Sequence, residues 1–452
     1  MLIRFVVSNF MSFKEETEFN MLPSKGNGSR KLPNHIVKTK SGAEILKTAA
    51  IYGANAAGKS NLIKAIEFLR ELITNEHQTH LVTQSQRFRL DDSYKSKPST
   101  FRIECNYNDI HYDYAIEIKK GKVVQEWLYK VDSVKKGTET LLFERKNGIV
   151  TFGEFKISKK NNLIYIKEFL KNELKENIPV LKLLKYRVQG TKLFDEIFDS
   201  FLFMKIVDPE SKSFEFMQSL STNIKSREFV ESLLSNSNTG IEKIKVEEID
   251  INNFFSYEDS DEKDRLIDAL ESEIETSSGN YVPFLIANNL HILKKVKKKY
   301  FVTVLKTKHF SSENLFDFNE ESDGTNRLFE LIPAFEELLE SNNSIYFIDE
   351  LERSMHPILA KEMLRLFSEN SKNNSQLIFT THESHLLDDE LLRRDEIWFS
   401  EKKPNGSTEF YPLSNFNPRG DKVLERGYLE GRYGGIPFLG DFSKLIKEEN
   451  QI

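Results

Sequence analysis

The hydrophobic residues of the chain form different patterns at its two ends and in its middle. Two short apolar runs near the start, Leu2–Val7 and Thr48–Tyr52, are typical of strands. The second run is continuously apolar in character, as expected for a strand that is buried on both faces. It leads into a glycine-containing turn and then into a helix, whose predicted apolar face carries Leu62, Ile66, Leu69 and Ile73.

The middle of the chain contains first a strand-like and then a helix-like pattern. Residues 100–157 alternate between apolar and polar positions and contain turn signals such as Lys120-Gly121-Lys122, which predicts hairpins. Over residues 160–240 the apolar residues recur every three to four positions, which favours helices. Residues 241–300 are mixed and contain no sustained apolar heptads, so a long coiled coil is not expected.

The last third of the chain returns to alternating strands and helices. The short apolar strands Ser344–Ile348 and Gln376–Thr381 are separated by a predicted helix near Pro357–Phe367. Another helix is expected after Gly324, with a kink at Pro333. Strands that alternate with helices indicate an α/β fold with a mainly parallel sheet.

Composition narrows the class of protein. The 452 residues include 64 Lys+Arg and 70 Asp+Glu, a net charge of −6, which argues against coating nucleic acid through bulk positive charge. With 39% hydrophobic residues and 35 Phe, the chain can bury a core. Its single cysteine, Cys105, excludes an internal disulfide, and no apolar run approaches the ~20 residues that span a bilayer. Without a signal-peptide pattern either, we expect a cytoplasmic protein that does not enter a membrane.

The segment between the Thr48–Tyr52 strand and the following helix carries the strongest motif. Gly53-Ala-Asn55-Ala-Ala-Gly58-Lys59-Ser60 matches the phosphate-binding loop Gly-x4-Gly-Lys-Ser/Thr without a mismatch, and Asn61 follows it. Glycines let successive N–H groups point at phosphate oxygens, and the helix adds its positive N-terminal end. Lys59 can reach the β- and γ-phosphates, and the Ser60 hydroxyl can bind Mg²⁺. The sequence therefore predicts an ATP and Mg²⁺ site.

Two later strands end in polar residues that suit the same chemistry. Ser344–Ile348 is followed by Asp349, a candidate Mg²⁺ partner, and by Glu350, which could orient and deprotonate an attacking water. His382 follows the strand that ends at Thr381 and could hydrogen-bond a γ-phosphate oxygen. Each motif alone is compatible with an ordinary loop. Together with the phosphate loop they favour nucleotide hydrolysis.

The order of these motifs resembles that of ABC-type ATPases, and more narrowly the SMC/RecF-related branch often described as AAA family ATP-binding proteins. The C-terminal segments Arg394–Phe399 and Tyr428–Pro437 resemble the RloA and AbiL type of abortive-infection ATPase. The resemblance rests on the phosphate loop and on Val7–Phe13, Glu321–Arg327, Asp349–Pro357, Thr381-His382, Arg394–Phe399 and Tyr428–Pro437.

The resemblance implies an ABC-type ATPase head assembled from both ends of the chain. Residues 1–157 would supply its N-terminal part with the phosphate loop and β hairpins, and residues 300–452 its C-terminal part. Residues 158–299 would form an inserted, mostly helical lobe. Lys59 and Asp349 are separated by 349 − 59 = 290 residues, too many for a compact minimal nucleotide domain, so the insertion is expected to project as a lobe or arm.

The resemblance also assigns a second set of nucleotide contacts. Ser322, Gly324 and Thr325 would contact the γ-phosphate held by the phosphate loop of a partner subunit, which implies a homodimer closed around two ATP molecules. A serine hydroxyl and glycine N–H groups at a helix start can bind an anion, although without the resemblance the segment is an N-cap turn. Arg327 and His356 are weaker candidates, because Arg327 could equally be an ordinary surface residue of a helix and His356 an ordinary loop histidine. The family's glutamine loop has no clear match; Gln84 and Gln86 are candidates.

Three functions stay open. The resemblance favours an ATPase that senses infection and controls a separately encoded effector in antiviral defence. The alternatives are a RecF-like DNA-repair ATPase, with a basic groove and DNA-stimulated hydrolysis, and an ATP-gated scaffold with little turnover. The basic run Lys294–Lys299 leaves nucleic acid open as a partner, although such runs are usually solvated. A nuclease of the OLD type is disfavoured, since only 452 − 382 = 70 residues follow His382.

Overall fold

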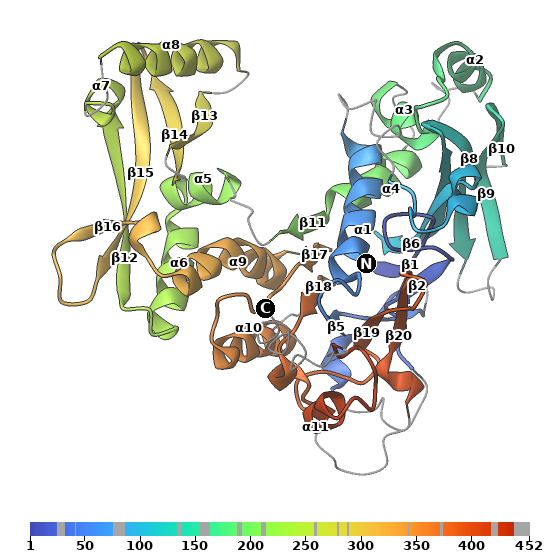
Figure 1. Ribbon diagram of the computed structural model, residues 1–452. Helices are drawn as coiled ribbons and strands as arrows, with labels where there is room; N and C mark the ends of the chain where they lie inside the picture. Colours follow the sequence, from blue (N-terminus) through green and yellow to red (C-terminus); the bar gives the residue numbers. More distant parts are fainter. Residues whose placement is uncertain are drawn as a thin grey trace, which may run out of the picture. The chain divides into compact units, whose positions relative to one another are not determined.

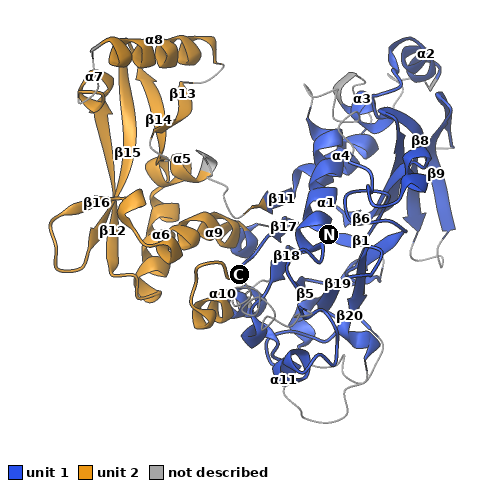
Figure 2. Cartoon of the chain, viewed as in Figure 1, with its two compact units in different colours: residues 1–206, 338–351, 364–452 blue, residues 207–337, 352–363 orange. Residues whose placement is uncertain are grey.

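The chain forms two compact units in the computed structural model (Figures 1 and 2). Unit 1 comprises residues 1–206, 338–351 and 364–452, and unit 2 comprises residues 207–337 and 352–363. No helix in the part of the chain that is described is both long and apolar enough to cross a membrane. The structure describes residues 1–24, 32–40, 42–75, 86–132, 138–153, 163–187, 192–208, 214–256, 260–277, 280–286, 289–341, 343–370, 374–416 and 424–437.

A mainly parallel six-stranded sheet lies at the centre of unit 1, as the strand–helix alternation predicts. The four inner strands run parallel, and the last strand is antiparallel to its neighbour. Every residue of β17 (Ile345–Ile348), β18 (Gln376–Thr381) and β5 (Thr48–Gly53) is buried, which explains why these strands are apolar on both faces. In spatial order the strands are β11 (Met204–Val207), β17 (Ile345–Ile348), β18 (Gln376–Thr381), β5 (Thr48–Gly53), β19 (Ile397–Lys402) and β20 (Thr408–Pro412).

A second, antiparallel sheet of seven strands contains the predicted hairpins. Buried and partly exposed residues alternate along β6, as expected for a strand with one face on the core. Strands β3 (Ile36–Lys38) and β4 (Glu44–Leu46) form a separate pair. The order in the large sheet is β10 (Ile149–Phe152), β9 (Thr138–Lys146), β8 (Lys122–Asp132), β7 (Ile110–Lys119), β6 (Ser99–Tyr107), β1 (Leu2–Ser8) and β2 (Thr17–Asn20).

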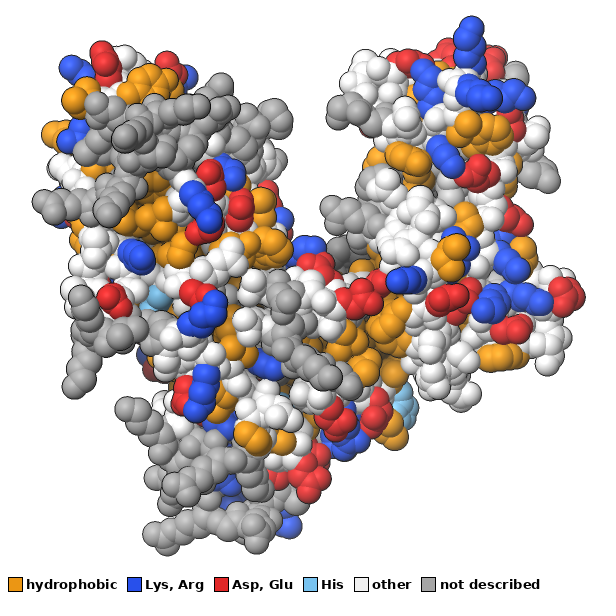
Figure 3. Space-filling view, turned by 180° about the vertical axis from the view of Figure 1, so that it is seen from behind, with side chains coloured by type: hydrophobic (Ala, Val, Ile, Leu, Met, Phe, Trp, Pro, Cys, Tyr) orange, Lys and Arg blue, Asp and Glu red, His pale blue; other side chains and the backbone are white. Residues whose placement is uncertain are grey.

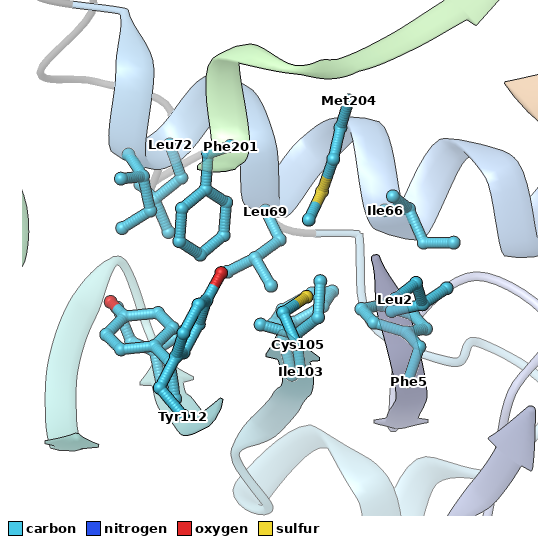
Figure 4. Close-up of a cluster of buried hydrophobic side chains, with 14 of the residues drawn as sticks. Leu2, Phe5, Ile66, Leu69, Leu72, Ile103, Cys105, Tyr112, Phe201 and Met204 are labelled. Carbon is cyan, nitrogen blue, oxygen red and sulfur yellow. The ribbon is translucent and has the colours of Figure 1, made fainter. Parts of the chain in front are cut away.

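One hydrophobic core joins the two sheets through helix α1 (Lys59–Thr74). All four apolar positions predicted for this helix are buried. Figure 4 shows part of the core, where Leu69 of α1 lies near Tyr112 and Cys105 of the antiparallel sheet and Phe201 of α4. The remaining helices of unit 1 are α2 (Leu163–Glu173), α3 (Val180–Arg187), α4 (Lys192–Leu202) and α11 (Leu424–Leu429), with short 3-10 turns at Pro33–His35, Asp92–Ser96, Ser384–Leu386 and Leu413–Asn415.

A buried glutamine links the two sheets directly. Gln376 begins β18, and its side-chain Oε1 accepts a hydrogen bond from the Leu2 N–H at 2.5 Å. Its Nε2 donates to the carbonyl oxygens of Leu2 and Leu46, at 3.0 and 2.8 Å. A fully buried amide therefore satisfies backbone groups from segments more than 300 residues away in sequence.

Unit 2 contains a five-stranded antiparallel sheet with helices (Figure 2). The prediction of a mostly helical insertion over 158–299 did not include this sheet, and helices α2–α4, which lie in that range, belong to unit 1. The charged strand β12 (Ile241–Asp250) is only partly buried, which obscured its strand pattern. The other strands are β13 (Tyr281–Ile286), β14 (Asn289–Val296), β15 (Lys299–His309) and β16 (Leu315–Asp317).

The helices of unit 2 cover this sheet and carry the segment that resembles the family signature. A separate hydrophobic core forms between α7 (Ile251–Phe254), α8 (Ser260–Thr276) and the sheet. Helix α9 (Asp323–Glu340) contains Pro333, as expected, and α9 and α10 (Pro357–Asn370) each cross the division between the units. The remaining helices are α5 (Phe214–Thr222) and α6 (Ile224–Asn236), with a 3-10 turn at Phe318–Glu320.

Candidate functional site

The loop between β5 and α1 is tightly curled and is held by the C-terminal strands. Gly58 has a φ of 106°, and a Cβ at this position would lie 2.2 Å from Thr408 Oγ1, so only glycine fits. The hydroxyls of Ser400 and Thr408 both donate to the Ala57 carbonyl, at 2.9 and 2.8 Å. Strands β19 and β20 therefore fix the shape of a loop encoded some 350 residues earlier.

The Lys59 side chain folds back onto this loop. Its Nζ donates to the carbonyl oxygens of Gly53 and Ala54, at 2.8 and 3.2 Å, and the residue is only 5% exposed. Lys59 is also the first residue of α1, where backbone N–H groups lack intrahelical acceptors. The ammonium, the loop and the helix start thus form one positively polarised cradle.

The parallel sheet brings the separate motifs to one edge. Strand β18 pairs with both β17 and β5, all in the same direction. Because the carboxyl ends of parallel strands meet at the same edge, Asp349 and Glu350 after β17, His382 after β18 and the loop after β5 lie together. Two stretches of chain 290 residues apart therefore converge as the sequence predicts.

A buried threonine positions both carboxylates. The Thr380 hydroxyl donates to Asp349 Oδ1 at 2.5 Å and accepts the Glu350 N–H at 2.8 Å. Glu350 adopts a φ of 50°, a left-handed conformation that is uncommon for a residue with a side chain. Sequence reasoning missed Thr380, although two consecutive threonines at the end of a fully buried strand were a signal that could have found it.

These residues surround a cavity of about 560 Å³. Of the predicted nucleotide-site residues, Asn55, Gly58, Lys59, Ser60, Asn61, Glu350 and His382 line it. Sequence reasoning missed three cations on the same walls: Arg87, Arg89 and Lys402. With Lys59 they outnumber the carboxylates, of which Glu350 supplies the only one among the described lining residues, so the cavity favours a polyanion such as a triphosphate.

The wall formed by residues 86–90 is held by the turn after β1. Asn9 Nδ2 donates to the carbonyl oxygens of Tyr94, Lys97 and Pro98, at 3.0–3.2 Å. Its Oδ1 accepts the Phe88 N–H at 3.2 Å. The Val7–Phe13 segment therefore holds this wall in place, and it also lines the cavity itself through Met11 and Ser12. Gln86 lines the cavity, whereas Gln84 lies outside the described residues.

Gly53 and Asn61 support the loop in different ways. A Cβ on Gly53 would lie 2.4 Å from the Ser400 carbonyl oxygen, so the strand end packs directly against β19. Asn61 Nδ2 donates to Ser12 Oγ at 2.8 Å, and the hydroxyls of Ser12 and Thr408 are hydrogen-bonded at 2.8 Å. This network links the helix start to the turn after β1 and to β20.

The oxygen ligands available here suit Mg²⁺. The Ser60 hydroxyl follows the loop lysine, and the Asp349 carboxylate is 7% exposed and oriented by Thr380. Magnesium usually takes one or two protein oxygens and completes its shell with phosphate oxygens and water. Ser60 and Asp349 thus fit the ion by chemistry, as Lys59 and the loop fit a triphosphate.

The signature-like segment lies in unit 2, at the start of α9. Ser322 Oγ accepts the Thr325 N–H at 3.2 Å, which is the geometry of an N-cap. A Cβ on Gly324 would lie 2.8 Å from the Ser354 carbonyl oxygen, so a larger residue would displace the helix start. A contact between Ser322, Gly324 or Thr325 and a partner's nucleotide stays a prediction.

The two weaker candidates, Arg327 and His356, lie in different surroundings. Arg327 is 2% exposed and pairs with Glu330 at 2.9 Å, so it is not the surface residue that its position on a helix suggested. His356 is exposed, and its Nδ1 accepts the Ile358 N–H at 3.3 Å, as a loop histidine would.

The basic run Lys294–Lys299 covers the end of β14, the turn after it and the first residue of β15. Lys294 pairs with Glu248 at 2.7 Å, and Lys295 pairs with Glu275. The Glu248 partner raises the pKa of Lys294. On the face shown in Figure 3, basic and acidic side chains of the described residues are interspersed. These pairs support the solvated alternative for the run over a nucleic-acid contact.

Comparison with known proteins places these motifs in a family. A family model described as "AAA domain, putative AbiEii toxin, Type IV TA system" matches residues 49–388, and no curated protein matches the chain. Among solved structures, an SMC head bound to the C-winged helix domain of ScpA is 13% identical, with a TM-score of 0.40 and coverage of 91% of this chain and 97% of that chain.

Two further SMC heads were found. The head domain from Thermotoga maritima is 12% identical, with a TM-score of 0.36 and coverage of 91% and 98% of the two chains. A head with an extended coiled coil, bound to the C-terminal domain of ScpA from Pyrococcus furiosus, is 12% identical, with a TM-score of 0.34 and coverage of 100% and 99%. The family model covers well over half of the chain, including the phosphate loop, the Asp349–Glu350 strand end and His382, and the chain therefore belongs to this family of AAA domains.

Proposed function

We propose that the chain binds ATP with Mg²⁺ in the cavity around Lys59 and hydrolyses it to ADP and phosphate. The observation that carries this proposal is the convergence of the phosphate loop, the Asp349–Glu350 strand end and His382 on one cavity. Four cationic side chains on its walls suit the charge of a triphosphate.

Each residue has a role that its position supports. Lys59 and the loop N–H groups bind the β- and γ-phosphates, and Ser60 and Asp349 hold Mg²⁺. Bound Mg²⁺ neutralises charge that develops on the phosphate oxygens. Glu350 accepts the proton of the attacking water as the bond to the γ-phosphorus forms and the bond to the ADP oxygen breaks. His382 donates a hydrogen bond to a γ-phosphate oxygen.

The active state that we propose is a homodimer. The start of α9 presents the Ser322 hydroxyl and the Gly324 and Thr325 backbone at a helix N-terminus, where an anion is favoured. In this arrangement the partner copy supplies these groups to the γ-phosphate. ATP binding would close the dimer and hydrolysis would reopen it, so the enzyme would act as a switch.

The biological role that we propose is control of a separately encoded effector in antiviral defence. The description of the matching family names the AbiEii toxin and type IV toxin–antitoxin systems, which supports a defence role over DNA repair. Two paired lysines in the basic run also give no support to a DNA-binding groove. An ATP-gated scaffold is the remaining alternative, and the Glu350 variant below separates it.

Two variants test the proposal with purified full-length protein in magnesium buffer. Lys59→Ala is expected to lose ATP binding, measured by equilibrium dialysis. Glu350→Gln is expected to retain ATP and to lower kcat at least about 100-fold, because the proton acceptor is removed. Glu409→Gln, an exposed residue of β20, is the matched control and should keep wild-type turnover.

Three outcomes would contradict parts of the proposal. Retention of ATP affinity by Lys59→Ala would exclude the cradle as the binding site. Wild-type turnover of Glu350→Gln would exclude its role as proton acceptor, and an unchanged biological effect despite lost turnover would favour the scaffold. For the dimer, light scattering of Glu350→Gln with ATP should show twice the monomer mass, and Ser322→Arg in the same background should stay monomeric.

A further inference from the structure

Unit 2 contains a second cavity, of about 300 Å³, at the lower end of the range of ligand pockets. It lies between α5, strands β14 and β15, the 3-10 turn at Phe318–Glu320 and the first turns of α9. It shares no lining residue with the cavity around Lys59. The proposed ATPase reaction gives it no role.

Stacked aromatic rings form part of its wall. Phe318 and Phe329 both line the cavity, and their rings stack with centroids 4.2 Å apart and planes 13° apart. Phe216 and Leu305 add further apolar surface. Flat aromatic walls favour a flat aromatic ligand, which gains contact area and offset stacking there.

A buried histidine supplies a polar group to the lining. His291 of β14 lines the cavity at 9% exposure, and within the described part of the chain its Nδ1 has no hydrogen-bond partner. Its ring is fixed by Phe254 and Phe284, whose centroids lie 5.0 and 5.6 Å away. Buried polar atoms nearly always have a protein, water or ligand partner, so a ligand atom that reaches Nδ1 would complete its hydrogen bonding.

Two amides extend this polar edge. Asn289 begins β14, and Asn326 lies in the first turn of α9; both line the cavity. An amide offers a donor and an acceptor side by side, which matches the edge of a heterocyclic base. Asn326 Nδ2 donates to the Glu321 carbonyl at 3.2 Å, so its side chain is held in place.

The charges around the cavity disfavour a phosphorylated ligand. No lysine or arginine is among the described residues that line it. Its carboxylates, Asp317 and Glu330, face Lys306 at 3.8 Å and Arg327 at 2.9 Å, so these cations are already engaged. A phosphate would meet carboxylates without a compensating cation, whereas an uncharged ring would not.

We propose that this cavity binds an uncharged planar heterocycle, a nucleobase carried by its nucleoside, with the ring against Phe318 and Phe329 and a base atom hydrogen-bonded to His291 Nδ1. Binding at this site does not depend on the proposed ATPase function. Asn326 directly follows Thr325 of the signature-like segment, which gives a bound ligand a route to affect hydrolysis. Only that effect rests on the proposed function.

The test uses full-length Lys59→Ala protein, so that the phosphate cradle contributes no binding. Adenosine, guanosine, cytidine, uridine and thymidine are each titrated to millimolar concentration and followed by saturation-transfer NMR and equilibrium dialysis. We expect at least one nucleoside to bind, and its 5′-monophosphate to bind more weakly. His291→Phe keeps an aromatic ring at this position but removes the imidazole nitrogens, and it should weaken nucleoside binding about threefold to tenfold. Lys295→Gln, on the same strand and outside the cavity, should leave it unchanged.

The proposal is overturned if no nucleoside binds, an outcome that would favour an aromatic side chain of a protein partner as the occupant. It is also overturned if His291→Phe and Asn289→Ala both bind the nucleoside with wild-type affinity. Asn289→Ala keeps the test valid should His291→Phe fail to fold, as judged by circular dichroism. ATP hydrolysis by the wild-type protein is measured separately, so failure here leaves the proposed function standing.

Discussion

The hydroxyl of Thr380 donates a hydrogen bond of 2.5 Å to Oδ1 of Asp349, at the point where two neighbouring parallel strands end. The same hydroxyl accepts the N–H of Glu350 at 2.8 Å. One fully buried side chain thus orients the proposed magnesium ligand and fixes the backbone of the proposed proton acceptor. Thr380 is a positioning residue, because it acts through its two neighbours.

Thr380→Val should lower kcat about 10- to 100-fold while changing the affinity for ATP far less. The substitution keeps the side-chain shape but leaves Asp349 and the Glu350 N–H without this partner, so both groups can move from the reactive geometry. Steady-state hydrolysis and equilibrium dialysis of ATP separate the two effects.

Thr48→Val is the control for that variant. Thr48 is 3% exposed on the adjacent strand β5, at the end away from the phosphate loop, so the change is similar in size and burial. It should keep a wild-type kcat. Equal turnover in the two variants would show that the Thr380 hydroxyl does not position the site.

The parallel sheet and the phosphate loop could be predicted because their signals are contiguous in sequence. The apolar strands β5, β17 and β18 are buried on both faces, so each is recognisable without knowing its neighbours. The sheet of unit 2 could not be predicted in the same way. The apolar residues of strand β12 recur at spacings of three, two and three, which is not the alternation of a strand. The strand is stabilised by pairing with β15, which begins almost 50 residues later.

The cavity walls depend on tertiary contacts that no local pattern reveals. Arg87 and Arg89 line the site because Asn9 holds their segment through hydrogen bonds to backbone groups some 80–90 residues away. Lys402 arrives with β19, whose register against β5 is a property of the folded sheet. The motif residues were therefore predictable, and the cations that surround them were not.

Gly58→Ala should lower the affinity for ATP at least about tenfold. The new Cβ would lie 2.2 Å from Thr408 Oγ1 and 2.9 Å from Ser12 Oγ, so either the loop or the network that holds Ala57 must shift. A displaced loop no longer directs its N–H groups at the phosphates. Equilibrium dialysis of ATP measures the loss.

Gly148→Ala separates this clash from backbone strain. Gly148 also has a positive φ, of 81°, but its Cβ would meet nothing within 4 Å. The variant should lose about 1 kcal/mol of unfolding free energy from left-handed strain and keep ATP affinity. If both glycine variants bind ATP equally well, the close approach at Gly58 is not what shapes the loop.

Gln376→Leu should destabilise unit 1 by about 2–4 kcal/mol. Its amide satisfies the Leu2 N–H and the carbonyl oxygens of Leu2 and Leu46 in a fully buried position, and leucine would leave these three groups unpaired. Urea unfolding followed by circular dichroism measures the change. Gln125→Leu, on the partly exposed face of β8, should shift stability by less than about 0.5 kcal/mol. Similar losses of unfolding free energy in both variants would show that the hydrogen bonds of Gln376 do not stabilise unit 1.

The single cysteine should report the opening of the unit 1 core. Burial raises the pKa of Cys105 from 9.0 to about 11 among the side chains shown in Figure 4, and the residue is 1% exposed. At pH 8 its thiolate fraction is then roughly a thousandth, compared with about a tenth in the unfolded chain, and the thiolate is the reactive form. Labelling by iodoacetamide should be at least about 100-fold slower in native protein than in urea.

The same shift predicts how stability depends on pH. The unfolded chain releases the Cys105 proton near pH 9, whereas the folded chain retains it until about pH 11. The folded state therefore binds more protons in this window, and the contribution of Cys105 to stability falls as the pH rises from 9 to 11.

The control for the labelling experiment is Glu139→Cys. This variant places a thiol at an exposed position of β9, where iodoacetamide should label it rapidly in native protein. Equally rapid labelling of Cys105 without denaturant would contradict its place in the core, because a thiol enclosed by α1, α4 and the antiparallel sheet reacts only when these elements separate.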